Sequence, residues 1–162
     1  MFANDEKRLR RCCFTGHRPE KLQREESEIK WLLNREIQAA ISDGITTFIS
    51  GMSRGVDLWA AQIVLTMKKE NMQLKLISVI PYENFEKNWS ANWKKEYWAV
   101  RAAADYVKVL APSYKKGMLS VRNRYMVDHA ARIIAVYHGG HGGTYQTLSY
   151  ARQKHVPIWL LS

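Results

Sequence analysis

The sequence has few cysteines and no long apolar run, and each absence narrows the class of protein. Its 162 residues include two cysteines, Cys12 and Cys13. Because these two cysteines are adjacent in the chain, they suit neither an ordinary disulfide nor a Cys-x-x-Cys site. Residues 1–11 are charged and lack the apolar segment of a secretory signal, and no apolar run is long enough to span a membrane. We therefore expect a cytoplasmic protein without a membrane span, whose cysteines are small core residues.

Acidic residues are also scarce relative to basic ones. The chain has 25 Lys and Arg against 15 Asp and Glu, a formal net charge of +10. This balance favours an anionic partner, which is either a nucleotide-type small molecule or a nucleic acid. The basic residues are spread along the chain, alternate with glutamates over residues 20–30 and form no long run. A nucleic acid is therefore the weaker of the two partner predictions.

Short apolar segments alternate with segments of helical periodicity along the chain. The predicted strands lie at about residues 10–14, 45–49, 74–80, 106–110, 133–137 and 156–161. The predicted helices lie at about residues 24–42, 55–71, 85–104, 118–131 and 145–154. This order indicates a parallel sheet with helices on both faces, and a hydrophobic content of 46% is ample for one core. The fold prediction is α/β: a single-domain, Rossmann-like three-layer α/β/α sandwich with a mainly parallel sheet of about six strands over residues 10–162, after a polar lead-in over residues 1–9.

Aromatic residues are concentrated on one face of the predicted helix over residues 85–104. Trp89, Trp93 and Tyr97 are spaced i, i+4, i+8, and Phe85 lies one turn earlier. Such a face most often packs against a sheet or a partner subunit, so a homodimer through it is one prediction. The neighbouring lysines leave base stacking as an alternative.

A glycine cluster lies between the predicted strand at 133–137 and the predicted helix at 145–154. Gly139, Gly140, Gly142 and Gly143 fall within five residues. Glycines let the backbone approach a phosphate closely, and the first N–H groups of a helix have no partner within it. Thr144 is expected to cap the helix or to bind a phosphate oxygen. The spacing is neither the dinucleotide fingerprint nor a P-loop, and a plain chain reversal is the alternative.

Loops with glycine and charged residues follow other predicted strands as well. In a doubly wound sheet the loops after the strands gather at the carboxyl edge, where ligands bind. One ligand site is therefore expected. Its predicted residues are Gly16, His17, Arg18, Gly51, Arg54, Gly55, Asp57, Arg122, Asp128, Gly139, Gly140, Gly142, Gly143 and Thr144.

Side-chain chemistry suggests roles within that site. Arg54 and Arg122 are suited to bidentate contacts with phosphate oxygens, and Asp57 to accepting ribose hydroxyls, a role that fits Asp128 less well. A structural ion-pair network between loops is the alternative for these charged residues. His138 and His141 have no carboxylate near them in the sequence, so no metal site is predicted. No catalytic residue and no cofactor is assigned.

Four motifs together resemble a known family. They are Thr15-Gly16-His17-Arg18-Pro19, the segment from Ser50 to Asp57, the segment from Arg122 to Asp128, and the Gly-Gly-x-Gly-Gly-Thr stretch. In this order and spacing they resemble the YpsA-like family of the SLOG superfamily. That superfamily of Rossmann-like proteins includes the DNA-processing protein DprA and the "lonely guy" phosphoribohydrolases. The resemblance implies a nucleotide or nucleotide-derived ligand, such as one with an ADP-ribose-like moiety, in a bacterial or prophage context.

The resemblance also bears on catalysis. The phosphoribohydrolases use a glutamate that follows a Gly-Thr pair for N-glycosidic cleavage, and Gln146 stands at the corresponding position here, while Arg122 resembles an arginine that they carry. An amide can neither take a proton nor stabilise an oxocarbenium charge as a carboxylate does. The prediction is therefore a non-catalytic sensor or regulator. A nucleotide N-glycosidase and a DprA-like nucleic-acid binder are the alternatives.

Overall fold

The computed structural model describes residues 6–161, so part of the polar lead-in lies outside the described residues. Six strands form one parallel sheet in the order β4-β3-β2-β1-β5-β6. The strands are β1 (Arg11–Gly16), β2 (Thr47–Ser50), β3 (Lys75–Ile80), β4 (Tyr106–Val109), β5 (Arg132–Val136) and β6 (Ile158–Leu161). The helices are η1 (Pro19–Lys21), α2 (Glu26–Ser42), α3 (Val56–Lys68), α4 (Ala91–Ala103), α5 (Met118–Asp128) and α6 (Gly143–Gln153).

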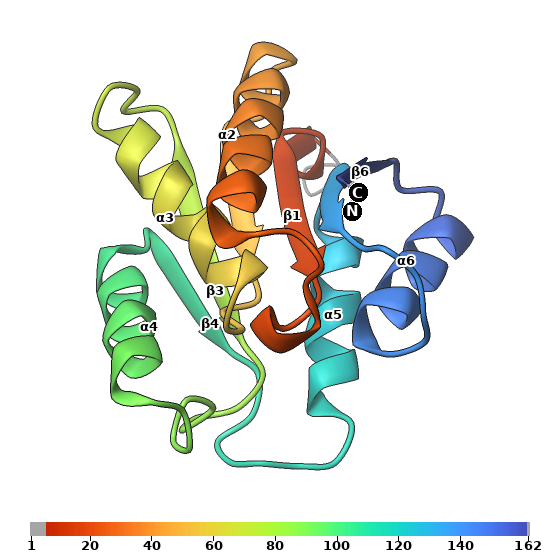
Figure 1. The fold of residues 1–162 in the computed structure, drawn as a ribbon. Coiled ribbons are helices and arrows are strands. Elements are labelled where there is room, and N and C mark those ends of the chain that lie inside the picture. Colours follow the sequence, from red (N-terminus) through yellow and green to blue (C-terminus); the bar gives the residue numbers. More distant parts are fainter. Residues whose placement is uncertain (1–5, 162) are drawn as a thin grey trace.

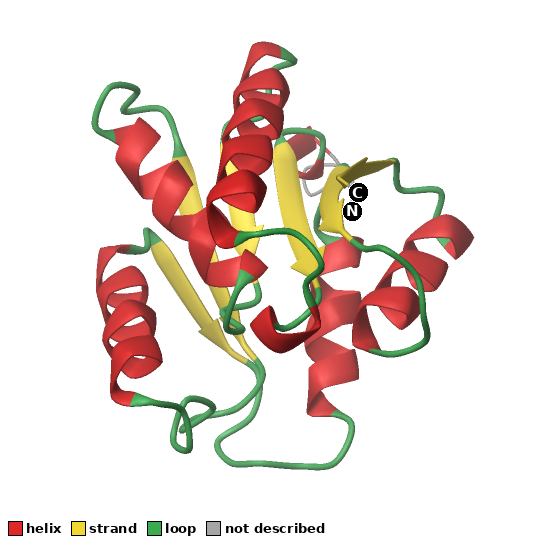
Figure 2. Ribbon diagram, in the orientation of Figure 1, coloured by secondary structure: helices red, strands yellow, loops and turns green. Residues whose placement is uncertain are grey.

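Helices cover both faces of the sheet, as Figures 1 and 2 show. Helices α2, α3 and α4 contribute to the larger core cluster on one face, and α5 and α6 contribute to the smaller cluster on the other. The strands β1 to β4 are added to the sheet in one direction, and β5 and β6 are added on the other side of β1, so the strand order reverses between β1 and β5. The predicted three-layer Rossmann-like architecture with a parallel sheet is confirmed.

Adjacent side chains of a strand point to opposite faces, and the two cysteines illustrate this. Cys12 joins the core cluster beneath α2 and α3, whereas Cys13 joins the cluster beneath α5 and α6. Both are free thiols, and burial raises the pKa of each. The expectation that they serve as small core residues is confirmed.

The helix predicted over residues 85–104 is shorter than expected, and that prediction was wrong at its start. Helix α4 begins at Ala91, where the Ser90 hydroxyl oxygen accepts a hydrogen bond from the backbone N–H of Trp93 at 3.4 Å. Serine is a favoured N-cap residue because its side chain satisfies an orphan N–H of the first turn. Phe85 and Trp89 therefore lie in the preceding loop.

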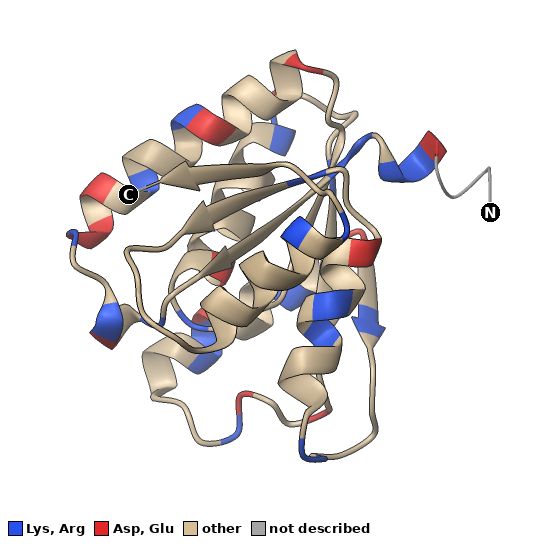
Figure 3. Ribbon diagram, turned by 90° about the vertical axis from the view of Figure 1, so that its right-hand side faces the viewer, with Lys and Arg blue, Asp and Glu red and all other residues tan. Residues whose placement is uncertain are grey.

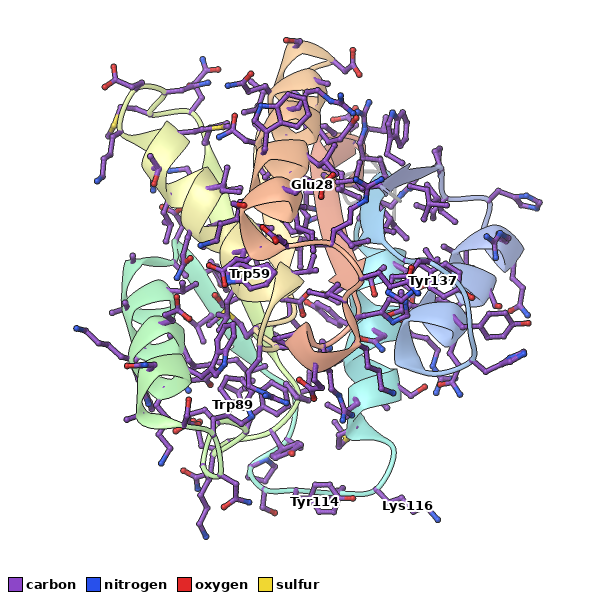
Figure 4. All side chains as sticks on the ribbon, viewed as in Figure 1. Glu28, Trp59, Trp89, Tyr114, Lys116 and Tyr137 are labelled. Atoms are coloured by element: carbon purple, nitrogen blue, oxygen red, sulfur yellow. The ribbon has the colours of Figure 1, made fainter. Side chains whose placement is uncertain are left out.

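The aromatic side chains still form one packed group, which covers α3 from within the chain. Trp93 packs against Trp59 of α3 with ring centroids 6.1 Å apart, and Trp89 meets Tyr97 edge to face at 5.6 Å. Tyr97 is fully buried. Trp59 and Trp89 are labelled in Figure 4, in the region where α3 faces α4. The packing interpretation of this face is confirmed, and the homodimer stays a prediction.

The described part of the lead-in is attached to the domain. Residues 6–8 are helical, and the Arg8 guanidinium donates a hydrogen bond to the carbonyl of Ala130 at 3.1 Å. None of the helices within residues 6–161 combines the length and the apolar character needed to cross a membrane.

Candidate functional site

The candidate site is a cleft of about 330 Å³ at the carboxyl ends of β1 and β5. These two strands flank the point where the strand order reverses, which is where doubly wound sheets bind ligands. The walls come from the loops after β1, β2 and β5, from η1, from the first turns of α3 and α6, and from one side of α5. In Figure 1 the N-terminal ends of α5 and α6 and the short helix η1 lie around this edge.

The glycine cluster forms the loop between β5 and α6. Gly139 and Gly140 have φ angles of +113° and +92°, which L side chains rarely adopt, and a Cβ at either would meet only open space. The requirement for glycine is thus in the backbone conformation, while the space above the loop stays free. The Tyr137 hydroxyl donates a hydrogen bond to the carbonyl of Gly140 at 2.6 Å and closes the loop on itself.

Helix α6 begins with an uncapped N-terminus that lines the cleft. Its N-cap is Gly142, which has no side chain to offer, so the expectation that Thr144 caps the helix was wrong. Thr144 is buried in the first turn. The backbone N–H groups of Gly143, Thr144 and Tyr145 have no acceptor among residues 6–161. Such orphan donors, together with the positive end of the helix dipole, favour an anion.

Arg122 of α5 ties the loop after β2 to the cleft. Its Nη1 donates to the carbonyl of Gly51 and to the Ser53 hydroxyl, the latter at 3.4 Å, and its Nε donates to the Asn123 side chain at 2.9 Å. The side chain is only 5% exposed. A Cβ on Gly51 would lie 2.9 Å from Asp57 Oδ2 and 3.0 Å from Arg122 Cδ, so the glycine makes room for this packing. Nη2 makes no hydrogen bond among the described residues, and the guanidinium carbon lies 5.7 Å from the centre of the Phe85 ring.

Asp57 is the one carboxylate that lines the cleft within residues 6–161. Its Oδ2 accepts a hydrogen bond from the backbone N–H of Ser53 at 3.2 Å. Burial raises the pKa of Asp57 to about 6, and the positive charge of Arg122 limits that rise. Burial likewise lowers the pKa of Arg122, against the pull of Asp57. The two side chains form a buried pair of opposite charges that is held through loop atoms and makes no direct ion pair.

Aromatic rings line another wall of the cleft. The rings of His17 and His138 lie 4.3 Å apart, and the Tyr137 ring lies 5.3 Å from His17 (Tyr137 is labelled in Figure 4). His138 Nε2 contacts the carbonyl of Lys21 at 2.8 Å, so this nitrogen carries a proton. His17 Nε2 accepts from the backbone N–H of His138 at 3.4 Å, which places the His17 proton on Nδ1. Burial, and then the charges of His138 and Lys21, lowers the pKa of His17.

The cleft brings together most of the residues that the sequence singled out. All of the predicted site residues except Gly51, Gly55 and Asp128 line it. Gly51 acts behind the wall through Arg122. Gly55 precedes α3 with a φ of +89° and lies against Pro19. Asp128 is outside the cleft, where its Oδ1 accepts a hydrogen bond from the Tyr150 hydroxyl at 2.7 Å.

The ion-pair alternative for the arginines is partly realised. Arg54 Nη2 lies 3.3 Å from Glu20 Oε1, so this pair connects the loop after β2 to η1 while Arg54 also lines the cleft. Sequence reasoning did not assign Lys21, Ser53, Asn123 or Tyr137, which line the cleft too. Ser53 and Asn123 adjoin predicted site residues, Arg54 and Arg122, whereas Lys21 and Tyr137 adjoin none.

Gln146 does not line the cleft. It lies on the neighbouring surface between α5 and α6, together with Ser120, Arg124 and Gln153. Within residues 6–161 no three His, Cys, Asp or Glu side chains gather closely enough to hold a metal ion.

Strand order and cleft position define a class of protein: a doubly wound, Rossmann-like α/β protein with its candidate site at the topological switch point. Within this class, the YpsA family model, described as the YspA SLOG family, matches residues 12–161. The chain therefore belongs to this SLOG family.

The chain is also similar to bacterial proteins. A UPF0398 protein of Ligilactobacillus salivarius is 31% identical over 119 residues, which cover 71% of this chain and 64% of that protein. The SPbeta prophage-derived protein YoqJ of Bacillus subtilis is 32% identical over 148 residues, which cover 80% of this chain and 86% of that protein. The chain thus spans less than two thirds of the first relative and most of the second.

Solved structures with the same fold are more distant in sequence. DNA processing protein A of Streptococcus pneumoniae superimposes with a TM-score of 0.68 at 15% identity, covering 98% of this chain and 52% of that chain. The Helicobacter pylori protein of the same name, described with its single-stranded DNA binding mode, gives 0.64 at 19% identity, covering 100% of this chain and 69% of that chain. At these identities the likeness shows a shared fold.

Proposed function

We propose that the cleft binds a nucleotide or a nucleotide derivative of the ADP-ribose type, and that the protein is a non-catalytic sensor. The observation that carries the proposal is the open N-terminus of α6, whose orphan N–H groups line the same cleft as Asp57. N–H groups that bind an anion and a carboxylate that accepts hydrogen bonds, in one cleft, suit a ligand that has both a phosphate and hydroxyl groups. A volume of about 330 Å³ lies at the lower end of the range of small-molecule sites.

The chemistry of the walls suggests how such a ligand is divided among them. The phosphate is assigned to the N–H groups of Gly143 and Thr144 and to Nη2 of Arg122, which makes no hydrogen bond among the described residues. The ribose hydroxyls are assigned to Asp57, which is ionised above its raised pKa of about 6 and then accepts hydrogen bonds. A flat base suits the rings of His17 and His138.

The single carboxylate supports binding without turnover. Glycosidic cleavage commonly uses a pair of carboxylates, one on each side of the bond, and Asp57 has no second carboxylate beside it in the described part of the cleft. Gln146 cannot supply one, because it is an amide and lies outside the cleft.

The proposal is tested by thermal shift and calorimetry on ligand-depleted protein with nucleoside monophosphates, NAD and ADP-ribose. Gly143→Asp is the most informative variant, because it places a carboxylate where the phosphate is expected to bind. The helix should tolerate the change, since acidic residues are favourable in the first turn of a helix. Gly143→Asn is the matched neutral control. We expect a saturable shift for one compound, which Gly143→Asp abolishes and Gly143→Asn largely preserves. No shift with any compound, or equal loss in both variants, contradicts the proposal.

A second candidate function is binding of single-stranded nucleic acid. It is supported by the net charge of +10 and by the Helicobacter pylori fold relative that is described with single-stranded DNA. Figure 3 shows the Lys and Arg positions spread over helices and loops on several sides of the sheet. Binding that is lost in Gly143→Asp would place the nucleic acid in the cleft.

A further inference from the structure

The amino edge of the sheet, opposite the cleft, carries a second hollow, of about 260 Å³. Four basic side chains line it: Lys7, Arg10, Arg11 and Lys75. Ile77, Tyr106 and two threonines, Thr46 and Thr47 at the start of β2, line it as well. This hollow does not belong to the proposed nucleotide site, because the two share no lining residue.

Strand register arranges these side chains in a row. Arg11 of β1 pairs with Thr47 of β2, and Thr47 pairs with Lys75 of β3. Partners in register across a parallel sheet point to the same face, and neighbouring strands are about 4.8 Å apart, so Arg11 and Lys75 stand about 10 Å apart on one face. Tyr106 of β4 pairs with Ile77 and extends the row on that face.

The outer face of β4 is left uncovered by the helices. Tyr106 is 69% exposed and Lys108 is exposed, whereas the alternate residues Val107 and Val109 pack against the core cluster on the other face. A strand at the edge of a sheet therefore presents an open aromatic ring and a lysine beside the basic hollow.

The positive charge of the hollow is largely uncompensated. Its one acidic lining residue, Asp105, already pairs with Lys68 and accepts a hydrogen bond from the backbone N–H of Leu76 at 2.9 Å. Arg11 Nε is buried and has no hydrogen-bond partner among the described residues. Lys7, Arg10 and Lys75 are exposed, and no described carboxylate forms an ion pair with them.

We propose that this surface, from Lys7, Arg10 and Arg11 across Lys75 to Tyr106 and Lys108, binds single-stranded nucleic acid. The spaced cations suit successive backbone phosphates, and the exposed ring suits stacking of an unpaired base. A double helix is not the expected ligand, because its bases are already stacked and are not available to Tyr106. The proposal is independent of the nucleotide site at the opposite edge.

The test is fluorescence anisotropy with a labelled oligothymidylate over a range of salt concentrations. The double variant Arg10→Glu/Lys75→Glu is compared with Lys94→Glu/Lys95→Glu, which makes the same change of net charge on α4, a helix that packs on the other face of the sheet. We expect the first to weaken binding at least about tenfold and to reduce the salt slope by about 1.4, about 0.7 for each lost phosphate contact, and we expect the control to do much less.

Tyr106 supplies a second, charge-independent readout. Tyr106→Leu keeps apolar bulk and removes the ring, so we expect about tenfold weaker binding with an unchanged salt slope, while Tyr106→Phe retains affinity. The proposal is overturned if oligothymidylate does not bind, or if both double variants weaken it equally. It is also overturned if only Gly143→Asp abolishes oligothymidylate binding. The same holds if these residues are needed for binding to phosphatidylserine vesicles and not for binding to oligothymidylate. Mononucleotide binding by the amino-edge variants reports separately on the cleft.

Discussion

The two edges of the sheet hold positive charge in opposite ways. At the carboxyl edge Arg122 is 5% exposed, and its guanidinium is bonded to the carbonyl of Gly51 and to the Asn123 side chain. At the amino edge Lys7, Arg10 and Lys75 are exposed on the surface, with no ion-pair partner in the described chain. The same type of charge is buried and hydrogen-bonded at one edge and exposed on the surface at the other.

This difference teaches what each edge is able to distinguish. A charge held in a low-dielectric wall interacts strongly and at one position, so it selects a ligand by geometry. Exposed charges are screened within about 8–10 Å at ordinary salt, so they attract polyanions with little selectivity. We therefore expect variants of the two edges to differ in stability, in pH response and in salt response.

The largest expected effect is on stability at the carboxyl edge. Arg122→Ala removes the cation that faces buried Asp57 and leaves the Gly51 carbonyl without its donor, so we expect a loss of about 2–4 kcal/mol. Urea denaturation measures it. Arg18→Ala, at an exposed position on the same edge, is the control and should change stability by less than about 0.5 kcal/mol. Equal stability of both variants and the parent would show that Arg122 is not a structural part of the wall.

The second expected effect is a pH dependence from Asp57. Its pKa is raised from 3.8 to about 6 in the folded chain, so the folded state binds the proton more tightly than the unfolded state does. The resulting stabilisation is fully present below about pH 4 and is lost as the pH rises through about 6. Two pKa units correspond to about 3 kcal/mol as an upper figure.

The measurement compares the unfolding free energy of the parent with that of Asp57→Asn, by urea denaturation between about pH 4.5 and 8. This range brackets the pKa of about 6 for Asp57 in the folded chain. We expect the parent to gain stability relative to the variant as the pH falls, whatever the difference between them at pH 8. A constant difference across this range would mean that the Asp57 carboxyl keeps an ordinary pKa.

The third expected effect is confined to the glycine loop. Gly140→Ala forces a Cβ onto a residue at φ +92°, and we expect it to cost about 1 kcal/mol and to weaken binding of the cleft ligand. Gly143→Ala is the control, because Gly143 lies in the first turn of α6 at an ordinary φ with open space around it. Thermal denaturation should separate the two, and equal melting would argue against a backbone requirement at Gly140.

The smallest expected effect is on stability at the amino edge. Lys75→Ala removes an exposed side chain, so we expect a change in unfolding free energy within about 0.5 kcal/mol and no change in mononucleotide affinity. The same calorimetric titration used for the cleft checks the second point. A marked loss of unfolding free energy or of mononucleotide affinity would show that the two edges are coupled.

Much of the carboxyl edge could be predicted from the sequence, because strand-loop-helix order alone fixes which loops meet there. Three predicted residues do not line the cleft, and for Asp128 helix geometry explains this. Asp128 lies six residues after Arg122, so the two side chains point about 120° apart around α5. The helix start at Ala91 was missed because an aromatic spacing continued through the Ser90 cap.

The amino edge could not be predicted in the same way. Its row of side chains depends on the register between β1, β2 and β3, which pairs Arg11, Thr47 and Lys75 over long separations in the chain. No local pattern marks those pairings. The uncovered face of β4 is also a consequence of helix placement, since Tyr106 and Lys108 look like ordinary residues of a buried strand when only the sequence is read.

The adjacent cysteines give the protein a built-in reporter of its own opening. Cys12 and Cys13 are buried on opposite faces of the central strand, and their raised pKa values keep both thiols protonated. A thiol reagent therefore modifies them only in molecules that have transiently unfolded the sheet. A compound that binds the folded chain reduces that population, so slower modification identifies ligands without a label or a catalytic assay.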